Sequence, residues 1–151
     1  MRNSIGTARL FQFVIVFILI FAAYLALSIK YSKTFKMKNE VINIIERNQG
    51  LTTTAGSIIK NYLNASGYDV TGKCESGWIG ANEGGTFETA SASKKYVYCI
   101  QKTKGYNDAS PNMSYYRVVL FYKFGLPVLD SIFNFNVSGE TVDIRVPLDS
   151  Y

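Results

Sequence analysis

The stretch LFQFVIVFILIFAAYLALSI, residues 10–29, decides the architecture of this chain. It contains no charged residue, and only Gln12, Tyr24 and Ser28 interrupt its apolar character. A helix of this length rises roughly 30 Å, which matches the hydrocarbon core of a bilayer. The stretch therefore predicts a single transmembrane helix.

A cleaved signal peptide is the alternative interpretation of the same stretch, because basic residues precede it and Ala22, Ala23 and Ala26 are small. The apolar stretch is longer than the roughly 7–15 residues of a signal-peptide core, and Tyr24 lies between the alanines. These features favour a retained anchor. The three alanines then become candidate positions for helix packing in the membrane, since small side chains permit close approach.

Charges and cysteines give opposite indications of orientation. Four lysines follow the span, against two arginines before it, and by the positive-inside rule they favour a cytoplasmic C-terminal domain: Lys30, Lys33, Lys36 and Lys38. Cys74 and Cys99 are the only cysteines, which is typical of one structural disulfide formed outside the cytosol; two buried free thiols are the alternative. We therefore favour a cytoplasmic segment 1–9 and an extracytoplasmic domain, with the lysines placed to meet lipid headgroups or a partner.

Helical periodicity continues beyond the span. Met37, Val41, Ile44 and Ile45 recur at spacings of three and four, which predicts a helical stalk over residues 30–50 that ends at Asn48-Gln49-Gly50. A second helix is expected from an N-cap at Thr52 or Thr53 to Gly67. Its apolar face is expected to comprise Ala55, Ile58, Ile59, Tyr62 and Leu63.

From Tyr68 onward the pattern alternates with a period of two, which predicts strands. The expected strands are Tyr68–Cys74, Tyr96–Lys102, Tyr115–Phe124, Ile132–Val137 and Thr141–Val146. The third has apolar residues on both faces and is expected to be central, while Ser138-Gly139-Glu140 predicts the turn of a terminal hairpin. Residues 75–93 and 103–114 are expected to be loops. The chain thus predicts an α+β protein: a transmembrane helix continuing into a stalk, a short second helix, and an antiparallel β-sheet in a domain over residues 51–151.

Trp78, the only tryptophan, lies with Ile79 in the Gly-rich loop between the cysteines. We favour the interpretation that Trp78 covers the disulfide and the edge of the core. The alternative is that the loop is a partner-binding element.

Catalysis has little support in the sequence. The chain has no histidine, which excludes histidine-based triads and most zinc sites. Ser91-Ala92-Ser93-Lys94 matches S-x-x-K, but the accompanying S-D-N motif is missing. We expect a non-enzymatic protein without a metal or cofactor. The net charge of +5 is partly explained by the membrane-flanking lysines and does not indicate nucleic-acid binding.

The order of these elements resembles that of pilins and pseudopilins. The resemblance is to TadE-like pseudopilins of Gram-positive bacteria, and it rests on segments 41–46 (VINIIE), 116–124 (YRVVLFYKF), 126–129 (LPVL) and 137–141 (VSGET). In that family the apolar helix serves first as a membrane anchor and then as the packing core of a filament. Phe11 stands five residues after Gly6, where prepilins carry glutamate, which argues against processing by a prepilin peptidase.

The resemblance implies a minor membrane component of a pilus or secretion apparatus. Its partners would be membrane lipid and other pilin-like or secretion-machine proteins, in an oligomeric state that the sequence leaves open. A freestanding membrane-anchored module that binds a wall polymer or protein through the Trp78 loop is one alternative. A structural membrane protein of a mobile element is another.

Overall fold

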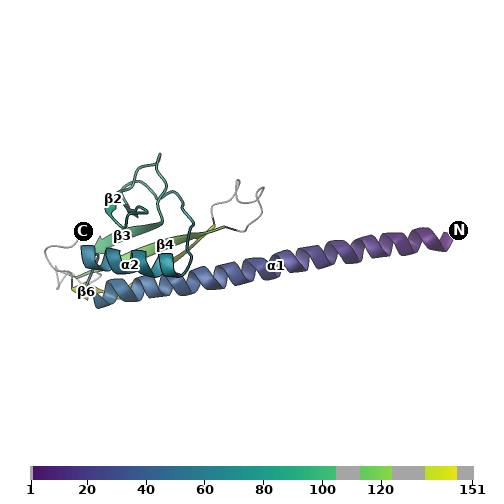
Figure 1. The fold of residues 1–151 in the computed structure, drawn as a ribbon, viewed down its shortest axis with the longest axis horizontal. Helices are drawn as coiled ribbons and strands as arrows, with labels where there is room; N and C mark the ends of the chain where they lie inside the picture. The colour runs from purple at the N-terminus through teal and green to yellow at the C-terminus, as the bar shows by residue number, and fades with distance from the viewer. Residues whose placement is uncertain (1, 105–112, 124–134, 146–151) are drawn as a thin grey trace.

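The structure is a computed structural model, which describes residues 2–104, 113–123 and 135–145. Its elements are α1 (Arg2–Arg47), α2 (Thr53–Ala65), β1 (Ile79–Ala81), β2 (Phe87–Thr89), β3 (Tyr98–Lys104), β4 (Met113–Tyr122), β5 (Phe135–Glu140) and β6 (Ile144–Arg145). This order confirms the predicted α+β fold, with a long N-terminal apolar helix, a short second helix and an antiparallel sheet. Figure 1 shows the N-terminal part of α1 extending far beyond the rest of the chain.

Helix α1 is continuous through the apolar stretch and the predicted stalk, as expected. Its end is a Schellman motif, in which the Gly50 amide donates to the Ile45 carbonyl and the Gln49 amide to the Glu46 carbonyl. Gln49 has the left-handed backbone that this motif requires, with φ of 54°. The predicted cap at residues 48–50 is therefore confirmed: Gly50 has a positive φ of 132°, and Gln49 before it has one as well.

Helix α2 begins as predicted, because the Thr52 hydroxyl accepts a hydrogen bond from the Ala55 amide at 3.1 Å. Gly67, with φ of 65°, lies just beyond the helix end. The buried face contains Ala55, Ile59 and Leu63. Ile58 was expected on this face but is 42% exposed, because its neighbour Ile59 occupies the position that faces the core.

The sheet is antiparallel throughout, with strand order β2-β1-β3-β4-β5. Strand β4 is central, as predicted: β3 lies along one edge, and β5 and then β6 lie along the other. Both helices cover the same face of the sheet (Figure 1).

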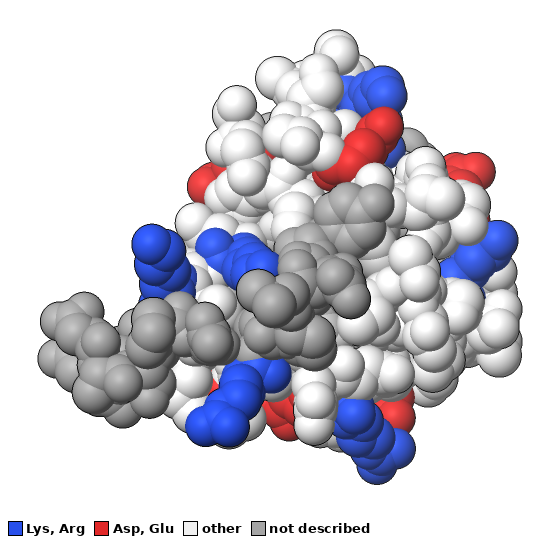
Figure 2. All heavy atoms as spheres, turned by 90° about the vertical axis from the view of Figure 1, so that its left-hand side faces the viewer, with Lys and Arg blue, Asp and Glu red and all other residues white. Residues whose placement is uncertain are grey.

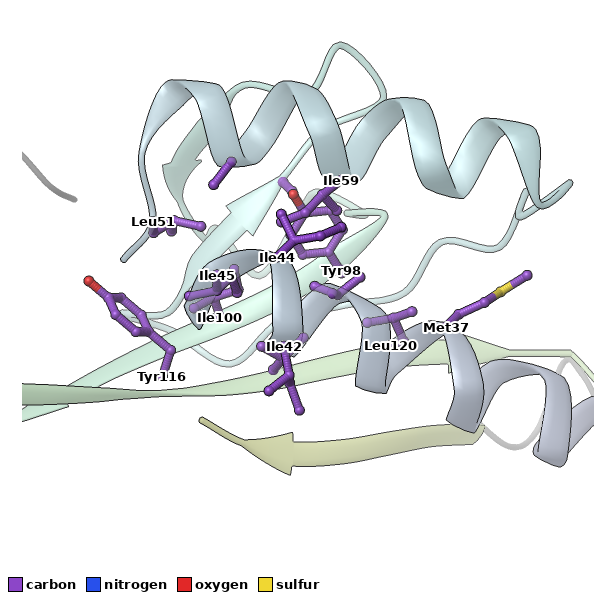
Figure 3. Close-up of a cluster of buried hydrophobic side chains, with 14 of the residues drawn as sticks. Met37, Ile42, Ile44, Ile45, Leu51, Ile59, Tyr98, Ile100, Tyr116 and Leu120 are labelled. Carbon is purple, nitrogen blue, oxygen red and sulfur yellow. The ribbon is translucent and has the colours of Figure 1, made fainter. Parts of the chain in front are cut away.

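The main core lies between the two helices and the sheet. Figure 3 shows Ile44 and Ile45 of α1 and Ile59 of α2 gathered with residues of β3 and β4, namely Tyr98, Ile100 and Leu120. Ile45, Ile59, Ile100 and Leu120 are fully buried. The stripe predicted on the stalk, Met37 to Ile45, is thus the side of α1 that packs on the sheet.

Two predictions in the middle of the chain were wrong. Segment 68–74 is not a strand and makes one isolated bridge, between Gly72 and Tyr96. β1 already occupies the edge of β3 beyond this point, pairing Ala81 with Tyr98 and Ile79 with Ile100. Residues 75–93, expected to be a loop, contain the short hairpin of β1 and β2, which turns at Gly85 with φ of 78°.

The predicted terminal hairpin was also wrong, because β5 and β6 each pair with β4 and Gly139 lies inside β5. A Cβ at Gly139 would lie 2.6 Å from Lys38 Nζ and 2.9 Å from Ile42 Cδ1. This glycine therefore lets α1 approach the strand closely and does not form a turn. Residues 124, 132–134 and 146 of the predicted strands and residues 105–112 of the second predicted loop lie outside the described part of the chain.

Replacing Ile59 by alanine should lower the free energy of unfolding by about 2–5 kcal/mol, because it leaves a cavity in the main core. The same substitution at the adjacent Ile58, which is 42% exposed, should cost about 1 kcal/mol or less. Urea titration of the full chain in detergent, followed by Trp78 fluorescence, measures both. Equal losses in the two variants would contradict the orientation of α2.

Candidate functional site

The N-terminal half of α1 is the most unusual surface of the molecule. Its large apolar side chains between Leu10 and Ile29 are 43–76% exposed, apart from Leu27, which is half-buried. Contiguous apolar patches on soluble monomers rarely exceed a few hundred Å², so such a surface requires lipid or another protein to cover it. The helix is long and apolar enough to cross a membrane, a property that signal sequences near an N-terminus share.

The three small residues predicted to pack helices lie on this half of α1. Ala22 and Ala26 are exposed and Ala23 is half-buried. Ala22 and Ala26 are four residues apart, so they lie on one face of the helix, one turn from each other. This spacing of small residues allows a second helix to approach closely.

Basic and aromatic side chains follow the apolar half of α1. Lys30, Lys33 and Lys36 are exposed, as predicted. The Tyr122 ring, at the end of β4, lies 6.0 Å from the Tyr31 ring of α1. The end of β4 therefore lies beside the helix close to the point where its apolar stretch ends.

Lys38 was expected at the surface with the other lysines, and this was wrong: it is only 6% exposed. Its ammonium group lies 4.2 Å from the centre of the Phe35 ring, and its side chain passes over Gly139 of β5. Burial lowers the pKa of the Lys38 ammonium group. The missing side chain of Gly139 provides the space, a relation that sequence spacing does not reveal.

Cys74 and Cys99 lie at disulfide distance, with Cα atoms 5.6 Å apart, on the sheet face opposite the helices. Their pairing joins the segment before β1 to strand β3. Around them is a second, smaller core, which includes the buried residues Ala90, Tyr96 and Phe121. The predicted disulfide pair is thus brought together by the fold.

Trp78 and Ile79, predicted as one binding loop, lie on opposite sides of the sheet. Ile79 begins β1 and packs against the main core. Trp78 is half-buried beside the disulfide cluster. It also borders a groove of about 360 Å³ on the outer face, where polar side chains include Arg117, Gln101 and Asn136. Of the two residues, Trp78 is the one available to an external partner.

Tyr68 packs against the main core and joins the segment after α2 to the sheet, and its sequence pattern did not single it out. Its hydroxyl donates to the Phe121 carbonyl at 2.8 Å and accepts from the Phe121 amide at 2.9 Å; the Val97 carbonyl lies 3.2 Å away. Burial raises the pKa of the Tyr68 hydroxyl, which keeps it protonated as a donor. Only tertiary structure brings these groups together, since Tyr68 and Phe121 are 53 residues apart.

Two ion pairs lie on the surface of the described domain. Glu88 binds Lys94 at 3.1 Å, and Arg117 binds Glu140 through its Nε atom at 2.8 Å. Lys94, the lysine of the S-x-x-K string, donates to the Glu88 carboxylate, and this hydrogen bond raises its pKa. Figure 2, which views the end of the domain away from the N-terminus, shows acidic and basic side chains scattered over that face.

Comparisons with known proteins add no relative: no family model, no curated protein and no solved structure matches this chain. Across residues 2–104, 113–123 and 135–145, no group of three or more His, Cys, Asp or Glu side chains is placed to hold a metal ion. Three surfaces stand out on the described residues: the apolar half of α1, the exposed lysines that follow it, and the outer groove.

The Cys74→Ser, Cys99→Ser double variant should unfold with a free energy about 3 kcal/mol lower, because the cross-link restricts the unfolded chain. Urea titration of the full chain in detergent, with and without reductant, measures this loss. Reductant should reproduce the loss in the natural sequence and leave the double variant unchanged. Alkylation of both cysteines in freshly isolated protein without reductant would contradict the disulfide.

Proposed function

We propose that this chain is a non-enzymatic, single-pass membrane protein that acts as a pseudopilin-like component of a pilus or secretion apparatus. In this role the apolar half of α1 anchors the chain and associates laterally with other apolar helices. The sheet domain is presented outside the cytoplasm.

One observation carries the proposal: α1 is a single helix with two different surroundings. Its C-terminal part, from Met37 to Ile45, is built into the main core, while residues 10–29 are exposed and apolar. A helix of this kind couples a folded domain rigidly to a membrane or to a bundle of similar helices. The resemblance to pilin-like proteins implies the same two roles for the helix, in the membrane or filament and in the folded domain.

The proposed orientation rests on the cysteine pair. Disulfides persist in extracytoplasmic compartments and are rare in the cytosol. The three exposed lysines after the span oppose this orientation under the positive-inside rule, and their side chains then lie at the outer surface. Retention of the anchor is supported by the length of the apolar stretch, which exceeds a signal-peptide core.

A second candidate function is a freestanding module that binds a polar surface ligand. The specific observation that favours it is the outer groove of about 360 Å³ bordered by Trp78, because a half-buried tryptophan beside polar groups is typical of recognition surfaces. The two candidates differ in what they require of α1: the module needs only an anchor, whereas the pseudopilin-like component needs lateral contacts between helices.

Orientation can be tested on intact cells with a membrane-impermeant maleimide. Cysteine introduced at Ser91, which is exposed, should be labelled from outside, and cysteine introduced at Ser4 should be labelled only after lysis. Each is made both with the natural cysteine pair and in the Cys74→Ser, Cys99→Ser background, so that loss of the disulfide does not decide the result. Protection of Ser91→Cys in both backgrounds would place the domain in the cytoplasm and refute the proposal.

Lateral association should depend on the face that carries Ala22 and Ala26. Ala22→Leu and Ala26→Leu should lower self-association in bilayers several-fold, because the larger side chains separate the helix backbones. Tyr24→Leu is the control, since it changes an exposed side chain on the other side of the helix. Energy transfer between labelled chains in vesicles measures association. A natural sequence that stays monomeric at every protein-to-lipid ratio, alone and with the membrane proteins of its host, would favour the second candidate.

A further inference from the structure

The edge of the domain next to the apolar half of α1 contains a cavity of about 220 Å³, where three parts of the chain meet. They are α1 just after its apolar stretch, the segment that follows α2, and the end of β4. Lys30 and Lys33 line it from the helix and Lys123 from the end of β4. Sequence spacing groups the first two, but only the fold brings Lys123, 90 residues later in the chain, to the same cavity.

The charge of the cavity is unbalanced. Its lining contains three lysines and one carboxylate, that of Asp69. Among the residues that the structure describes, the ion pairs are those of Lys94 and Arg117, and none involves the cavity lysines. All three lysines are exposed. Such a site attracts an anion more strongly than a scattered, mixed-charge surface such as that in Figure 2.

The position of the cavity along α1 indicates which anion it would bind. The headgroup layer on each side of a bilayer is roughly 5–8 Å thick, and a helix rises 1.5 Å per residue. Lys30 directly follows the apolar stretch, and Lys33 lies about 5 Å farther along the axis, so both ammonium groups fall at headgroup depth. The ring contacts of Tyr122 with Tyr31 and Phe135, at 6.0 and 5.5 Å, place the end of β4 at the same level and supply aromatic groups typical of a membrane interface.

From this geometry we propose that the cavity binds the phosphate of an anionic phospholipid headgroup through Lys30, Lys33 and Lys123. The lipid's acyl chains lie along the apolar half of α1 while its headgroup fills the space between the helix and the domain. This inference rests on the membrane-spanning part of the proposed function but not on assembly into a pilus. It adds a lipid preference that anchoring alone does not require.

The test uses the full chain in detergent and native mass spectrometry, titrated with phosphatidylglycerol or phosphatidylcholine. Phosphatidylglycerol should bind more tightly. Lys33→Gln and Lys123→Gln should each weaken its binding about fivefold, the factor that corresponds to about 1 kcal/mol for a lysine near an anionic surface. Asp69→Asn should strengthen it.

Lys36→Gln is the matched control, because Lys36 is an exposed lysine of the same helix that does not line the cavity. It should change the binding of phosphatidylglycerol by less than about twofold. If Lys36→Gln weakened binding as much as Lys33→Gln, attraction would be diffuse and the inference would be overturned. Equal binding of the two lipids would also overturn it.

Two further measurements separate the remaining outcomes. Millimolar inorganic phosphate should compete poorly with phosphatidylglycerol; full displacement would mean that the site takes free phosphate, and the lipid assignment would fail. Carbonate extraction of reconstituted vesicles reports insertion independently. Insertion without a headgroup preference would overturn this inference alone, whereas extraction of the chain would overturn the proposed anchoring and this inference with it.

Discussion

The burial of one stripe of α1 against strands β4 and β5 is the interaction on which the rest of the structure depends. Met37, Val41 and Ile45 supply the helix side of the main core, and Val118 and Leu120 supply the sheet side. Each fully buried side chain of this size stabilises the fold by about 1.5–3 kcal/mol. Without α1 the part of this sheet face that packs on it would be exposed, so the helix that carries the apolar stretch is also an essential part of the domain.

A second set of interactions fixes the segment between α2 and β1. The cysteine pair joins the segment before β1 to β3, and the Tyr68 hydroxyl holds the Phe121 backbone of β4. Gly72 lies directly against the Phe121 ring, where a side chain would not fit. These contacts tie a segment with little regular secondary structure to the central strands, which explains how the long connection from α2 to β1 is held.

Elements with strong periodicity were predictable from the sequence, and elements set by tertiary contacts were not. The apolar stretch, the stripe of α1, the cap of α2 and the central strand all carry a local signal that one sequence contains. The local pattern around Gly139 predicts a turn, and only the proximity of Gly139 to Lys38 and Ile42 explains why a glycine lies inside a strand there. The site shows the same division. The cysteine pair was predictable, but the burial of Lys38 and the meeting of Lys30 with Lys123 depend on how α1 lies along the sheet.

A continuous helix also constrains how the domain sits relative to a membrane. A flexible linker after a span would let a domain move freely, and its lysines would meet the headgroups in no fixed geometry. Here no linker intervenes: Lys30 and Lys33 belong to the same helix as the buried Met37, one to two turns away. The packing that stabilises the domain thereby fixes the position of the cavity along α1. If α1 spans a membrane, the same contacts that fold the protein also align its basic cavity with the headgroup layer.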